Sequence, residues 1–222
     1  MGIPSEQEIT QILNSSYSPS HLDQLEAYLD AQMEGTVKYH TEALRNLVKL
    51  YQLFPETFKQ DKLESASLLA LIHNVMDLWA LQYMLPHAFA NTESLTFVVK
   101  SCATMLEACQ FDAFWKSYQD DLVNCSSNAT IAKVAKSSIP TVQSAIIKLL
   151  ALTYKEAPTS VVTKALQIPS EQDPVLQTHT SVESATSEKV VFVGSSENTK
   201  RQKVFQDGVD FSAITALIGK TA

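Results

Sequence analysis

The sequence predicts a mainly α-helical protein: a helical-repeat superhelix of the HEAT/ARM-like kind, followed by a small winged-helix domain. Glycine is scarce, with five in 222 residues and none from 36 to 193, which favours helices over a turn-rich β fold. Apolar residues recur at helical spacing through most of the first 155 positions. After Pro158 the pattern changes to short apolar and polar stretches, so we divide the chain into domains 1–156 and 157–222.

The first domain is predicted to be a series of amphipathic helices joined by short linkers. Ser20 and Asp23 predict the cap of a helix that Gly35 ends. Residues 63–85 are apolar almost all round, so a helix there must be covered on several sides. Helices spaced about 20 residues apart are typical of a solenoid, although a single compact bundle fits the same pattern. The other apolar stripes lie within residues 22–33, 44–51, 95–109, 111–122 and 129–155.

The second domain is predicted to contain shorter elements. Residues 161–168 predict a helix, any helix after it begins near Asp173, and residues 181–188 are expected to form a loop. A partner strand is predicted at Val204-Phe205. The one convincing strand consists of Val190, Val191, Phe192 and Val193. A last helix is predicted from the spacing of Phe211, Ile214, Leu217 and Ile218. A helix, a linker, a strand, a turn, a second strand and a terminal helix in this order predict a winged-helix unit.

Four segments carry a resemblance to a known family. The run LVKLYQLFP at 47–55 and the run LEACQFDAFW at 106–115 resemble the k-subunit family of eukaryotic translation initiation factor 3, the second being the more specific match. Residues 190–194 lie where that family has its wing strand, and VDFSAI at 209–214 resembles its closing segment. The resemblance covers nearly the whole chain and implies a PCI domain, a helical repeat followed by a winged helix. The chain departs from the family over 170–188, so no contact role is carried onto those residues.

The resemblance implies a non-catalytic scaffold subunit of initiation factor 3 in the cytoplasm. Its partners would be other subunits of that factor, especially the l subunit, and through the complex the small ribosomal subunit, to which messenger and initiator transfer RNA are recruited. One alternative is a small PCI scaffold subunit of the signalosome or the proteasome lid, which share the architecture. A second alternative is a free-standing winged-helix nucleic-acid-binding module.

Charge and cysteine content bear on these alternatives. The net charge of −7 comes entirely from residues 1–110, whereas residues 111–222 are neutral overall. An acidic first half argues against broad nucleic-acid binding, which depends on neutralising phosphates. The three cysteines show no C-x-x-C spacing, which is typical of reduced thiols in the cytoplasm. No apolar stretch is long enough to predict a membrane span, so no membrane partner is expected.

No catalytic, cofactor or metal site is predicted, and no small-molecule substrate is expected. The sequence has no G-x-G-x-x-G, P-loop or G-x-S-x-G motif, and its five histidines are scattered without H-E-x-x-H spacing. His73 could be a buried catalytic base, but a core histidine is the commoner arrangement. Asp120-Asp121 is predicted to be a solvated surface pair. Cys109 is expected to behave as a small hydrophobic residue on an apolar stripe.

Four sets of residues are candidates for contacts with other molecules. Val190, Val191, Phe192 and Val193 are expected to present a strand edge that pairs with the next subunit's edge. The stripe of Phe211, Ile214, Leu217 and Ile218 can pack internally or join a shared bundle. Lys200, Arg201 and Lys203 could touch RNA, but three charges bind only weakly and a hydrated loop is the preferred interpretation. Aromatic residues at helical spacing are usually core, although a partner-binding face stays open for Phe111, Phe114, Trp115 and Tyr118.

Overall fold

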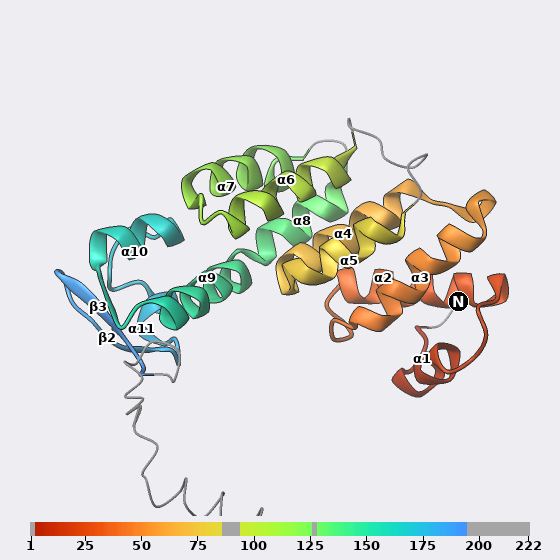
Figure 1. Ribbon diagram of the computed structural model, residues 1–222, viewed down its shortest axis with the longest axis horizontal. Helices are drawn as coiled ribbons and strands as arrows, with labels where there is room; N and C mark the ends of the chain where they lie inside the picture. The colour runs from red at the N-terminus through yellow and green to blue at the C-terminus, as the bar shows by residue number, and fades with distance from the viewer. Residues whose placement is uncertain (1–2, 86–93, 126–127, 195–222) are drawn as a thin grey trace, which may run out of the picture.

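The computed structural model describes residues 3–85, 94–125 and 128–194, and these form a mainly helical protein with one small sheet. The molecule is elongated, with the N-terminal helices at one end and the sheet at the other (Figure 1). The mainly α-helical prediction is therefore confirmed. No helix among the described residues combines the length and apolarity needed to cross a membrane.

The helices of the first part follow one another with short connections. In chain order they are α1 (Glu6–Leu13), the 3₁₀ turn η1 (Pro19–His21), α2 (Leu22–Met33), α3 (Thr41–Leu53), the 3₁₀ turn η2 (Pro55–Thr57), α4 (Gln60–His73), α5 (Val75–Met84), α6 (Leu95–Glu107), α7 (Phe111–Ser117), the π-helical turn η4 (Tyr118–Val123), α8 (Ala129–Ser137) and α9 (Ile139–Thr153). We call α1–α9 the helical stack.

The ends of α2 show how local sequence sets the helix boundaries. The predicted cap at Ser20 is wrong, because the η1 turn precedes α2 and is capped by the Ser18 side chain, which accepts a hydrogen bond from the Ser20 backbone. Gly35 ends the helix as expected, with a left-handed φ of 75° that glycine adopts without strain. The backbone N–H of Thr36 donates to the carbonyl of Ala31, which closes a Schellman motif.

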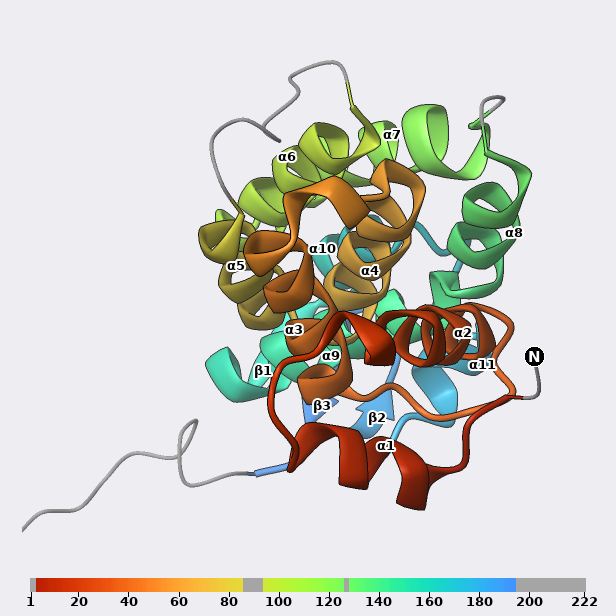
Figure 2. The ribbon, with the colours of Figure 1, turned by 90° about the vertical axis from the view of Figure 1, so that its right-hand side faces the viewer.

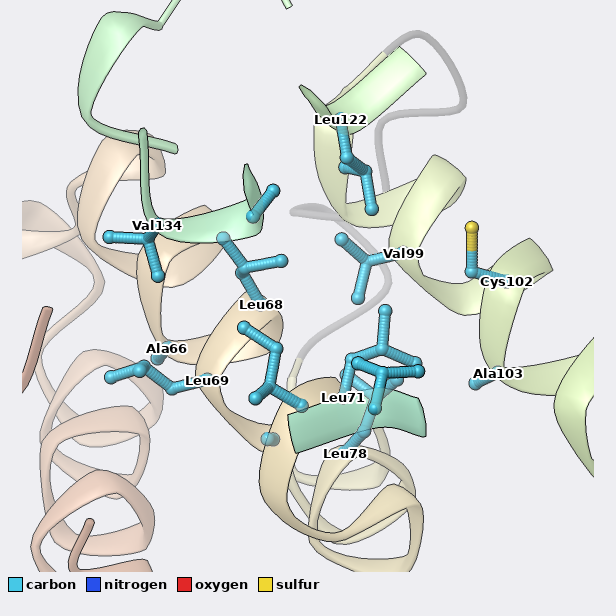
Figure 3. Packing of buried hydrophobic residues seen from close by; sticks show 14 of the residues in the cluster. Ala66, Leu68, Leu69, Leu71, Leu78, Val99, Cys102, Ala103, Leu122 and Val134 are labelled. Carbon is cyan, nitrogen blue, oxygen red and sulfur yellow. The ribbon is translucent and has the colours of Figure 1, made fainter. Parts of the chain in front are cut away.

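Helix α4 lies at the centre of the stack and is covered by several others. Seen from the N-terminal end (Figure 2), α2, α3, α5, α6 and α8 surround it. Leu68, Leu69 and Leu71 of α4 point in different directions and are buried, and Leu68 lies toward Val134 of α8 (Figure 3). The predicted apolar segment 63–85 is two helices, not one, because Asn74 is extended between α4 and α5 and its side chain caps α5.

A buried carboxylate ties the start of α5 to α3. Asp77 accepts hydrogen bonds from the hydroxyls of Tyr39 (3.0 Å) and Thr41 (2.9 Å) and from the guanidinium of Arg45 (2.8 Å). Three donors compensate the cost of burying this carboxylate. Burial, chiefly, raises the pKa of Tyr39 above its ordinary value, so the phenol stays protonated and keeps donating.

The second part consists of short elements around a three-stranded antiparallel sheet. They are β1 (Glu156–Pro158), α10 (Thr159–Leu166), α11 (Pro174–Gln177), β2 (Val182–Ala185) and β3 (Lys189–Phe192). The strand order is β1-β3-β2, with Ala157 and Ala185 both opposite Val190. The predicted helices are found here as α10 and α11, but the loop expected over 181–188 is wrong, since it supplies β2. The strand expected at 204–205 and the last helix lie outside the described residues.

Buried hydrogen bonds join the sheet region to the stack. The indole Nε1 of Trp115 on α7 donates to the carbonyl of Ala165 (2.8 Å), and the side-chain amide of Gln143 on α9 donates to the carbonyl of Leu166 (2.9 Å). Both carbonyls lie at the C-terminal end of α10, where a helix leaves acceptors without partners of its own. Helix α10 is thereby fixed against α7 and α9.

Candidate interaction surfaces

An apolar hollow of about 380 Å³ lies where the α4–α5 junction faces the α6–α7 turn and α9. Figure 1 shows these elements meeting near the middle of the molecule. A second hollow, of about 650 Å³, shares Ile72, His73, Ala145 and Leu149 with the first and extends along α9. We call the two together the α9 groove. Its mainly apolar lining includes Ile72, Val75, Leu106, Phe111, Ile146 and Leu149.

Each wall of the groove has a local structural cause. The break at Asn74 turns the start of α5 outward, which leaves Met76 68% exposed. Helix α6 ends in a Schellman motif in which Cys109 has φ 54° and the N–H of Gln110 donates to the carbonyl of Met105. Helix α9 contributes Leu149 and Leu152, which are 40% and 52% exposed. The groove is therefore an open apolar surface and not a closed cavity.

His73 lies at the groove, and neither expectation for it is correct. It is the last residue of α4 and is exposed, because the helix ends there. Its ring stacks on that of Tyr39 at 4.5 Å, and partial burial lowers the pKa of His73. Cys109 is also exposed at the α6–α7 turn, where it was expected on a buried stripe. These two side chains, with Asn74, Glu107 and Lys148, give a mainly apolar groove some polar character.

A serine of the groove lining, Ser144 on α9, meets His179, a pair that sequence spacing did not reveal because 35 residues separate them. The Nε2 of His179 lies 2.9 Å from the hydroxyl of Ser144, and the backbone N–H of Ser181 donates to Nδ1. Since Nδ1 accepts, the neutral ring carries its proton on Nε2 and donates it to Ser144. A base that activates serine must accept at that position, so this pair is arranged for structure and not for nucleophilic catalysis.

The expectation that Val190–Val193 presents a free strand edge is wrong. β3 is the middle strand of the sheet, with β1 on one side and β2 on the other, so its backbone groups are already paired. Val190 and Phe192 are buried, Val191 is half-buried and Val193 follows the strand. A neighbouring subunit cannot add a strand to β3 while this sheet is intact.

The outer strands of the described sheet are poorly suited to strand addition. β1 has three residues and ends in Pro158, which has no backbone N–H to donate. β2 has an irregular register between Val182 and Ser184, which leaves Glu183 out of step with β3. Short edges, proline, bulges and charges all discourage the pairing of further strands. The sheet edges are therefore weak candidates for binding a partner, and the open apolar α9 groove is the stronger one.

The remaining sequence predictions divide into three groups. Phe114, Trp115 and Tyr118 are completely buried, so the core interpretation is confirmed for them, whereas Phe111 lines the groove. Asp120 and Asp121 are exposed, as expected for a surface pair. The remaining candidates lie outside the described residues: Phe211, Ile214, Leu217, Ile218, Lys200, Arg201 and Lys203.

Two further findings complete the description of possible sites. Within residues 3–85, 94–125 and 128–194, no three histidine, cysteine, aspartate or glutamate side chains come together as metal ligands would. No protein-family model matches the chain.

Proposed function

We propose that this chain is a non-catalytic scaffold subunit of eukaryotic translation initiation factor 3, with PCI architecture. In this role it supports assembly of the preinitiation complex on the small ribosomal subunit in the cytoplasm. It acts through protein–protein contacts, with the l subunit as its nearest neighbour. The proposal rests on the sequence resemblance described above and on the α9 groove.

The groove is the observation that carries the proposal. Open apolar surfaces bounded by a few polar groups are typical of sites where proteins bind one another. The segment 106–115, which carries the most specific resemblance, forms the α6–α7 turn and supplies Leu106 and Phe111 to the groove wall. The segment with the most specific resemblance to the k-subunit family thus also contributes to the candidate binding surface.

The decisive experiment is recovery of partners from cytosolic extract with a tagged full-length chain. We expect the chain to bring down initiation factor 3 subunits, including l, and to co-sediment with small ribosomal subunits. Leu149→Asp places a charge in the groove and should reduce that recovery several-fold. Leu53→Asp is the matched control, since Leu53 is 47% exposed on α3 and does not line the groove.

Other recoveries would contradict the proposal and identify a rival. An isopeptidase recovered without ribosomal proteins would indicate a signalosome or proteasome-lid subunit. Tight, salt-sensitive binding of RNA by the purified chain would indicate a nucleic-acid-binding module. Equal loss of partners in Leu149→Asp and Leu53→Asp would show that the groove is not the contact surface.

A further inference from the structure

The exposed faces of α5 and α9 carry almost no charge. Asp77 is the one charged residue of α5, and it is buried. Lys148 is the one charged residue of α9. A helix that faces water normally places several charged residues on its outer side. These two faces are therefore better suited to contact with another molecule than to contact with solvent.

The α9 groove between these faces has a side-chain spacing that a helix fits. Ala145, Leu149 and Leu152 are exposed and follow one another at i, i+4 and i+7 on α9, and Met76 of α5 lies exposed across the groove. Side chains at this spacing form ridges that pack against the ridges of a second helix, and the small Ala145 allows a close approach. The 15 residues of α9 are about 22 Å long, which is the length of a partner helix of about four turns.

The charges at the groove leave one lysine without a partner. Lys148 is exposed and forms no ion pair with any described residue. Glu107, the one acidic residue of the described lining, accepts a hydrogen bond from the indole of Trp79 (2.6 Å), and the ammonium of Lys100 lies 6.0 Å from the centre of that ring. The lowered pKa of His73 leaves its ring uncharged near neutral pH. An acidic residue of a partner would therefore complement Lys148.

We infer that the α9 groove binds an amphipathic helix of a partner protein, with the apolar residues of that helix against Leu149 and Met76 and an acidic residue beside Lys148. This is the helix-in-groove mode of recognition, in which the apolar contacts supply affinity and the charge selects the partner. The inference deepens the proposed function and rests on its use of the groove as the contact surface. It adds the chemistry of the segment that binds there.

Two synthetic peptides of about 14 residues test the charge preference on the purified full-length chain. Both carry leucine at i, i+4, i+7 and i+11 and alanine at most other positions, which favours a helix. The acidic peptide has glutamate beside the leucine stripe, and the basic peptide has lysine at the same positions. Fluorescence anisotropy at low salt should show several-fold tighter binding of the acidic peptide, and added salt should reduce the difference. Non-specific attraction to a chain of net charge −7 would give the opposite order.

Variants of the chain show where the peptides bind. Lys148→Glu should weaken binding of the acidic peptide several-fold and strengthen binding of the basic one. Lys133→Glu is the matched control, at an exposed lysine of α8 that does not line the groove, and should leave both affinities unchanged. Leu149→Asp should weaken both peptides and Leu53→Asp neither, with circular dichroism checking that all four variants fold. Equal effects of the two lysine changes, or tighter binding of the basic peptide to the unchanged chain, would overturn the inference.

The peptide measurements and the recovery from extract can fail separately. Absence of initiation factor 3 subunits from the extract experiment would refute the proposed function, whereas the preference of the groove for an acidic helix is measured on the purified chain alone. Equal binding of the two peptides would refute that preference and leave the recovery result intact. Light scattering of the free chain supplies the last arm: a dimer that Leu149→Asp dissociates would overturn the inference and assign the groove to a second copy.

Discussion

At the scale of single residues, Trp115 has the most consequential position. Its side chain is buried among Phe114 and Tyr118, with ring centroids 5.1 and 5.8 Å away, and its Nε1 reaches the carbonyl of Ala165. One side chain thus contributes both to the aromatic core and to the attachment of α10. The aromatic pattern predicted the core role, but no sequence signal predicted the hydrogen bond, since its acceptor lies 50 residues away.

Trp115→Phe should lower the free energy of unfolding by about 2–4 kcal/mol. The change leaves the Ala165 carbonyl buried without its donor and opens space beside Tyr118. Urea unfolding followed by circular dichroism measures the effect. Trp79→Phe is the matched control: Trp79 also donates through Nε1, to Glu107, but that hydrogen bond is exposed. A loss as large as that of Trp115→Phe would refute the assigned importance of the α7–α10 contact.

His179 makes stability depend on pH. Burial and the nearby charge of Lys148 lower the pKa of His179. Between that lowered pKa and the unfolded value of about 6.5, the unfolded chain binds more protons, so the free energy of unfolding falls as pH drops through this range. The contribution is fully present above about pH 6.5. His73 has a lowered pKa as well and acts in the same direction.

His179→Ala should therefore weaken, but not abolish, the loss of stability on acidification. The measurement is urea unfolding at pH 7.5 and at pH 5.5, each compared with the unchanged chain. The variant loses some stability at pH 7.5, because Ser144 and the Ser181 N–H lose their partner, and loses less than the unchanged chain on going to pH 5.5. His21→Ala serves as the control. A steeper pH dependence in His179→Ala would contradict the assignment.

At the scale of elements, the α3–α5 contact depends on Asp77. Asp77→Ala should cost about 3 kcal/mol, because it removes a buried carboxylate and leaves Tyr39, Thr41 and Arg45 without their acceptor. Asp30→Ala removes the ion pair between Asp30 and Lys62, which is of similar length. Because Asp30 is exposed, this change should lower the free energy of unfolding by less than about 1 kcal/mol. Thermal or urea unfolding compares the two. Equal effects would mean that burial of Asp77 does not matter.

Among the secondary-structure elements, the long helices could be predicted from the sequence and the short strands β1 and β2 could not. Long helices carry a repeated apolar face, so their existence followed from spacing, and the break at Gly35 set the end of α2. β1 and β2 were missed because three or four residues carry little periodicity, and β1 in addition pairs with β3, which lies about 30 residues further along the chain. The groove was missed for a related reason: its walls come from three separate parts of the chain. Of the lining residues, His73, Cys109 and Phe111 were singled out beforehand, and only Phe111 was considered as part of a partner-binding face.

At the scale of the whole molecule, the stack and the sheet region are coupled through α10. The hydrogen bonds of Trp115 and Gln143 end on adjacent carbonyls, and both donors are in the stack. We expect equilibrium unfolding in urea to be a single transition, with tryptophan fluorescence and far-ultraviolet circular dichroism giving the same midpoint. In Trp115→Phe/Gln143→Leu, the two parts should begin to unfold separately. Two transitions in the unchanged chain would contradict this coupling.

The strand order determines when the sheet can fold during synthesis of the chain. Within the described part of the chain, β1 and β2 do not pair with each other, and each pairs with β3, which comes last of the three. During synthesis the stack can pack as its helices emerge from the ribosome, whereas β1 and β2 wait without a strand partner until Phe192 has been released. Because the middle strand is synthesised last, the sheet forms late and in a single step as each new chain folds.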